Sequence, residues 1–177
     1  MRARGQMLVV IALLLMAVLM LLAVAVDGGR LLIERARLRR SAQAAADAGI
    51  GLVAEQMVTQ AAARQTQAAL LPTCAPAGPC TPTPALNDVP GWLTDEDRAT
   101  LVAPLMQTQV AAEARDYAQR NAFPEAEVTY PEAYDPGGPV VRILVTLRRR
   151  ATILLAGLLG EEWVDLDEQA LSQVPQR

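Results

Sequence analysis

Few side chains in this 177-residue sequence could carry out chemistry. The two cysteines, Cys74 and Cys80, have no histidine or further cysteine beside them to complete a zinc site. The chain has no histidine at all, which removes the commonest general base and metal ligand. Its two serines, Ser41 and Ser172, do not lie in the strand–turn–helix pattern of a nucleophile. We therefore predict a protein that is not an enzyme and that holds no cofactor.

An acidic stretch near the C-terminus could in principle bind calcium. It runs through Glu161, Glu162, Asp165, Asp167 and Glu168, without the spacing of a twelve-residue calcium loop. The sequence favours a solvated strand edge over a metal site.

Charge is unevenly distributed along the chain. Residues 27–70 carry six arginines against four acids, whereas residues 90–177 carry eight arginines against fourteen acids. The acidic balance of the C-terminal half argues against nucleic acid as a partner.

The element that positions the rest of the chain is an apolar stretch at residues 7–26. This stretch holds no charge, proline or glycine. As a helix it would span about 30 Å, the thickness of the hydrocarbon core of a bilayer. The alternative is a cleaved signal peptide, because Ala23 and Ala25 form a possible A-x-A site. The apolar stretch exceeds the roughly 7–15 residues of such signals, which favours a retained anchor.

The residues after the anchor form a predicted membrane-exit interface. Asp27 could cap the helix or form a salt bridge at the membrane exit, or it could be a solvated boundary residue. Arg35, Arg37, Arg39 and Arg40 could contact anionic lipid or a partner subunit, or could be ordinary interfacial charges whose long side chains reach past the apolar surface. These residues are Asp27, Arg30, Arg35, Arg37, Arg39 and Arg40.

The helical pattern continues beyond the anchor to about Leu70, with apolar residues mostly at three- and four-residue steps. Gly28 and Gly29 could bend this helix without ending it. Its second half is rich in alanine, which would let another element approach closely. We divide the chain into an anchor (1–27), the continuation of the helix (28–70), a Pro-rich loop with both cysteines (71–93) and a head (94–177).

The head is predicted to begin with a helix from Asp95 to Asn121, capped by Thr94 with Asp97 and ended at Asn121. Pro104 should kink this helix or delay its start. A buried stripe is expected along it, formed by Leu101, Val102, Leu105, Val110, Ala114 and Tyr117.

Beyond this helix the period changes to that of strands. We predict strands at 126–130 and 140–147, paired as a hairpin, then a short helix from Ala151 to Leu159, a strand at 162–167 and a frayed tail from Gln169. The predicted fold class is α+β: a long helix that carries a second helix and a short antiparallel sheet.

Three stretches occur in an order that resembles a known family. They are Arg4-Gly5-Gln6 before the anchor, AVDGGRLLIERARLRRSAQAAADAGI at residues 25–50, and a closing segment from Ala114 to Val164. In this order they resemble the TadE/TadG-like pilus-assembly proteins of the tight-adherence (Flp) system. The resemblance implies an exported head and a structural or assembly role, as a pseudopilin-like or minor pilin-like subunit of a pilus or related secretion apparatus.

Gly5 and Gln6 are a possible processing site on this resemblance, or Gly5 is simply a flexible residue before the helix. Pilin-like members usually have glutamate at the fifth mature position, where this chain has Val10. The partners implied are the bilayer and other subunits, in a homo- or hetero-oligomer. The alternative is a membrane-tethered module that binds a ligand or secreted partner.

The arginine count alone would place the head in the cytoplasm, because more arginines follow the anchor than precede it. We nevertheless expect a single-pass protein with a cytoplasmic N-terminus and an extracytoplasmic head. The short basic N-terminus, the cysteine pair and the family resemblance all favour this orientation. In an oxidising compartment Cys74 and Cys80 would form a disulfide.

Overall fold

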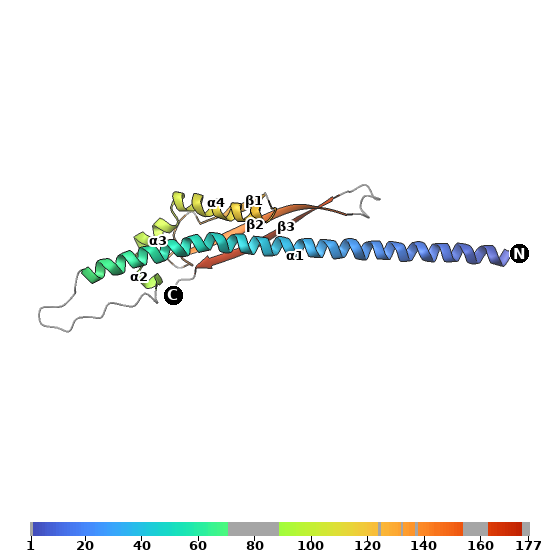
Figure 1. The fold of residues 1–177 in the computed structure, drawn as a ribbon, viewed down its shortest axis with the longest axis horizontal. Coiled ribbons are helices and arrows are strands. Elements are labelled where there is room, and N and C mark those ends of the chain that lie inside the picture. The colour runs from blue at the N-terminus through green and yellow to red at the C-terminus, as the bar shows by residue number, and fades with distance from the viewer. Residues whose placement is uncertain are drawn as a thin grey trace.

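A single helix dominates the architecture (Figure 1). The computed structural model describes residues 2–70, 89–123, 125–131, 133–136, 138–153 and 163–174, with residues 2–6 and 70 described by their backbone only. Helix α1 runs without a break over Arg2–Leu70. Gly28 and Gly29 lie within it, so the glycines do not end the helix. The predicted continuity from the apolar stretch into the alanine-rich half is confirmed.

The head is built on the second half of α1. Its helices are α2 (Val89–Trp92), α3 (Asp95–Leu101) and α4 (Pro104–Arg120), and its strands are β1 (Ala126–Thr129), β2 (Val141–Thr152) and β3 (Trp163–Val174). The strands form an antiparallel sheet in the order β1-β2-β3. The expected α+β fold is therefore present, with one long helix and a small sheet.

Small side chains on α1 allow the head to pack closely. Ala42, Ala45 and Ala46 are fully buried, and α4 faces them with its own Ala114 and Ala118. Closest of all is Gly49, where an added Cβ would lie 3.1 Å from Cγ1 of Val110 and 3.2 Å from Cδ1 of Ile143. Gly49 thus sits where α1, α4 and β2 meet.

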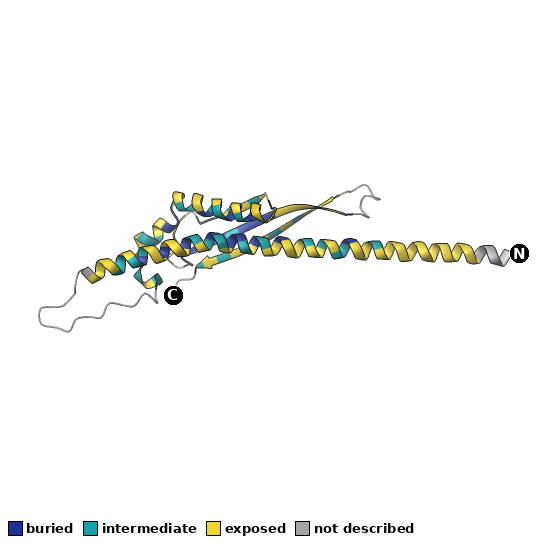
Figure 2. Cartoon of the chain, viewed as in Figure 1, coloured by how far each residue is buried: buried dark blue, intermediate teal, exposed yellow. Residues whose placement is uncertain are grey.

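Strand β2 supplies the other side of this core. Its alternate residues Val141, Ile143, Val145 and Leu147 are fully buried, as the period-2 pattern predicts. Burial follows this packing along α1: the buried residues begin near the head, while residues 7–22 are exposed (Figure 2).

The helix predicted from Asp95 to Asn121 is two helices. Pro104 is the first residue of α4, where its missing N–H costs nothing, and α3 ends at Leu101. Leu105 is exposed, so its assignment to the buried stripe is wrong, while Leu101, Val102, Val110 and Ala114 are buried. Asn121 caps α4 as expected, and its side-chain amide donates to the carbonyl of Tyr117 at 2.9 Å.

The strands are longer than the sequence predicts. Ala151 and Thr152 extend β2, where they pair with Val164 and Trp163, so the predicted helix does not begin there. Strand β3 continues to Val174 in register with Val141, so the tail is not frayed from Gln169. Cross-strand hydrogen bonding overrides the local pattern in both places, together with the burial of Ala151 in β2 and of Ala170 in β3.

Some sequence predictions fall outside the described residues. Both cysteines and most of the Pro-rich loop (71–88) do, as do residues 154–159 of the predicted short helix. Helix α2 lies at the end of the predicted loop region. The proline content of this region predicts a loop, so the sequence does not reveal the helix.

Candidate functional site

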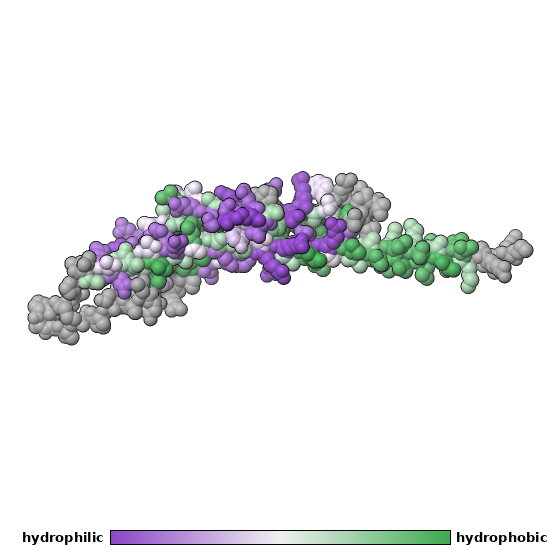
Figure 3. All heavy atoms as spheres, in the orientation of Figure 1, coloured by the Kyte–Doolittle hydropathy of each residue, from purple (hydrophilic) through white to green (hydrophobic). Residues whose placement is uncertain are grey.

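The apolar stretch of α1 is bare in this structure. Its leucine, isoleucine and methionine side chains, among them Leu8, Leu14 and Leu19, are more than half exposed. They form a continuous hydrophobic rod beyond the head, whereas the head surface is mixed and largely polar (Figure 3). Among the described residues, α1 alone is long and apolar enough to cross a membrane.

The predicted exit interface lies between this rod and the head. Asp27 is only 6% exposed, and it lies far from either end of α1. It is therefore neither a helix cap nor a solvated boundary residue. Arg30, Arg37, Arg39 and Arg40 are exposed. We refer to Asp27, Arg30, Arg35, Arg37, Arg39 and Arg40 as the collar.

Two acids connect the collar to the head. Arg35 donates to the carboxylate of Glu168 on β3, and this contact raises the pKa of the Arg35 guanidinium through the hydrogen bond and the opposite charge. Glu34 pairs with Arg37 at 3.4 Å and with Arg149 of β2 at 3.3 Å. Further along, Ser172 of β3 donates to Asp47 at 2.8 Å.

Arg149 and Arg150 of β2 also lie beside the collar, an arrangement that the sequence does not predict. Arg149 lies 5.5 Å from the ring of Phe123, and Arg150 lies 4.3 Å from the ring of Trp163. Arg148 pairs loosely with Glu127 at 3.8 Å. The run of three arginines was visible in the sequence, but its position beside α1 depends on a strand pairing that local patterns do not encode.

Two hollows lie beside these arginines. One, of about 760 Å³, is lined by arginines and acids together with Ala122 and Leu166. The other, of about 120 Å³, lies between the arginines of β2 and the first collar turn; it is lined by Arg30, Leu31, Glu34, Arg149, Arg150, Ala151 and Thr152. Both have mixed charge, and neither brings together the groups of a catalytic site.

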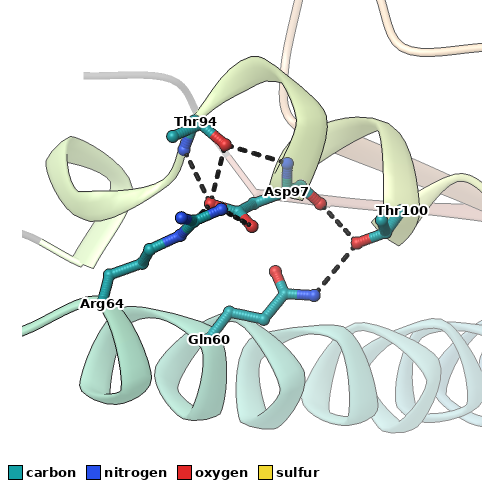
Figure 4. A network of polar contacts seen from close by, with 5 residues as sticks. All are labelled: Gln60, Arg64, Thr94, Asp97 and Thr100. Carbon is teal, nitrogen blue, oxygen red and sulfur yellow. Dashed lines mark hydrogen bonds and ion pairs between the residues drawn. The ribbon is translucent and has the colours of Figure 1, made fainter. Parts of the chain in front are cut away.

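The other end of α1 is fastened to α3 by a polar network (Figure 4). Arg64 donates to both oxygens of Asp97, at 3.0 and 2.9 Å. Asp97 also accepts from the backbone N–H and hydroxyl of Thr94, at 3.0 and 2.8 Å, and so completes the predicted capping box. Gln60 donates to the hydroxyl of Thr100 at 3.0 Å. The bidentate arginine, with the Thr94 bonds, lowers the pKa of Asp97 to about 2.

We expect Asp97→Asn to lower the free energy of unfolding by about 1 kcal/mol at pH 7. The value is modest because the Arg64 side chain is 39% exposed and water screens the pair. Since the native pKa lies below the unfolded one, this contribution is present above pH of about 4 and is lost as the pH falls through about 2. Urea unfolding of the full chain in detergent micelles at pH 7 and pH 2 would measure it.

Asp95→Asn is the matched control, because Asp95 lies in the same helical turn but its side chain is 81% exposed. It should change stability little at either pH. Equal losses for the two variants would contradict a specific role for the Arg64–Asp97 contact.

The other predicted site residues are not brought into the collar. Gly5 and Gln6 lie within α1 near its start, and their processing remains a prediction. Cys74 and Cys80 lie outside the described residues, so their disulfide also remains a prediction. Within the described part of the chain, no group of three or more acidic or cysteine side chains is placed to hold a metal ion.

No protein-family model, curated protein or solved structure matches this chain.

Proposed function

We propose that this protein is a membrane-anchored structural or assembly subunit of a tight-adherence-type pilus or a related secretion apparatus. The observation that carries the proposal is the division of α1. One half packs a folded head, and the other half is a bare apolar rod with no partner among the described residues. Such a rod is satisfied in lipid or against the rods of neighbouring subunits.

The family resemblance supports the choice of apparatus. Gly5-Gln6 before the rod and the VDGGR exit followed by an arginine- and alanine-rich helix are the residues behind it. In this role the rod docks among other membrane helices and the head, held outside the cytoplasm, presents its surface to neighbours. No step of this mechanism requires catalysis.

Co-purification tests the proposal. A C-terminally tagged chain, extracted from its native membrane in mild detergent, should recover pilin, secretin or assembly-platform subunits enriched at least about tenfold over a control. The control replaces residues 7–26 by an unrelated Leu/Ala segment of the same length, which keeps the anchor but removes the side-chain pattern of the rod.

The proposal fails if the native chain and the control recover the same background proteins. Recovery of a single secreted partner with no apparatus subunit would instead support a membrane-tethered binding module. That alternative would direct attention to the 760 Å³ hollow beside Arg148 and Asp167.

A further inference from the structure

The β2–β3 hairpin runs alongside α1 towards the apolar rod. Ile143 packs against Gly49, and Arg149 pairs with Glu34 at 3.3 Å. Between these two contacts β2 advances about 20 Å and α1 about 22 Å, at the usual rise of strand and helix. The strand therefore runs nearly parallel to the helix axis and in the direction of the N-terminus.

The end of this hairpin lies level with the end of the rod. Ala151 and Thr152 line the small hollow together with Arg30 and Leu31, which follow Asp27 by about one helical turn. Thr152 pairs with Trp163, so Trp163 stands at the same level. Any membrane that the rod spans would have its headgroup layer at this height.

The side chains at this end are those found where proteins meet a headgroup layer. Trp163 is 48% exposed, and its neighbour Val164 is also exposed. Arg150 stacks on the Trp163 ring at 4.3 Å. Tryptophan and arginine favour this layer because each combines an apolar body with a polar end.

We propose that the end of the β2–β3 hairpin, formed by Arg148, Arg150, Trp163 and Val164, is a second membrane contact that binds the phosphates of lipid headgroups. It rests on the proposed function only in requiring that the rod spans the bilayer. Residues 154–162 are outside the described residues and are not part of the proposed surface.

The existing ion pairs do not oppose this contact. Arg150 pairs with Asp165 at 3.3 Å, and all four side chains of the Arg148–Glu127 and Arg150–Asp165 pairs are well exposed. Exposed pairs of this kind contribute little, so a lipid phosphate can compete for the arginines. Contact with the membrane at two points would fix the rotation of the head about the axis of the rod. A single membrane-spanning helix leaves this rotation free.

The two tryptophans of the chain allow a direct test. Trp163 lies at the proposed contact, whereas Trp92 ends α2 close to Thr94, which shares Asp97 with Arg64. Along α1, Arg64 lies about 55 Å beyond Asp27. Full-length Trp92→Phe and Trp163→Phe variants would be placed in nanodiscs at one copy each, with lipids brominated near the top of their acyl chains. Quenching of tryptophan emission would then be compared.

We expect the bromolipids to quench more than half of the Trp163 emission in Trp92→Phe, and less than a tenth of the Trp92 emission in Trp163→Phe. Adding Arg148→Gln and Arg150→Gln to Trp92→Phe should roughly halve the quenching in anionic lipid. Equal, weak quenching of both tryptophans would overturn the proposal. Burial of Trp163 only in crowded vesicles, without quenching in single-copy nanodiscs, would assign the surface to a second copy of the chain and overturn it too.

Failure of the membrane contact is distinguishable from failure of the proposed function. A chain that resists carbonate extraction but leaves Trp163 unquenched keeps its anchor and lacks the second contact. A chain that carbonate extracts from vesicles lacks the anchor itself.

Discussion

Gly49→Leu should lower the free energy of unfolding of the head by about 3 kcal/mol, among the larger effects of a single substitution. Even a Cβ at this position would lie 3.1 Å from Val110 and 3.2 Å from Ile143, and leucine adds three further carbons. Because α1, α4 and β2 meet here, no single element can move aside without disturbing the others. Urea unfolding of the full chain in detergent micelles, followed by circular dichroism, would measure the loss.

Gly51→Leu is the matched control, since nothing lies within 4 Å of a Cβ at Gly51. It should stabilise the chain by about 0.5–1 kcal/mol, because leucine is the better helix former. A second check is Gly49→Ala combined with Ile143→Val, which removes the Cδ1 atom in the way and should cost less than the two single changes added together. If Gly49→Leu were as stable as Gly51→Leu, the close approach of the three elements would be wrong.

Deletion of residues 2–26 should release the protein from carbonate-washed membranes into the soluble fraction. The deleted stretch has only exposed or partly exposed side chains among those described, and the first buried apolar side chain along α1 is Leu38. The core of the head therefore loses no packing, and circular dichroism should show a folded, sheet-containing chain. A peripheral contact at the hairpin would not survive the carbonate wash.

Replacing residues 7–26 by a Leu/Ala segment of equal length is the control, and it should keep the chain in the pellet. A folded chain without residues 2–26 that remained in the pellet would contradict the assignment of membrane anchoring to α1.

The features that the sequence predicts well are those with local causes. The length of the apolar stretch predicts the rod, the alternation in β2 predicts its buried face, and Thr94 with Asp97 predicts the capping box. Pro104 marks the start of α4 because proline tolerates only the first helical turn.

The features that it misses depend on contacts between distant segments. Ala151 and Thr152 read as the start of a helix, but twelve residues of β3 pair with β2 and draw them into the sheet. The same pairing places Arg149 and Arg150 beside the first turn of the collar, at Arg30. In the sequence these arginines are more than a hundred residues from Arg30. Collar residues such as Arg30 could be identified from sequence, whereas Trp163 could not, since nothing local ties it to α1.

The position of the head relative to the membrane is the central claim, and it goes against the plain arginine count. Proteinase K applied to spheroplasts, or to whole cells if there is no outer membrane, tests it on a chain with a C-terminal epitope. We expect the protease to cut the head and remove the epitope without lysis, while a cytoplasmic marker stays intact. Full protection of the region after α1 in intact spheroplasts, with digestion only after lysis, would place the head in the cytoplasm and contradict the account.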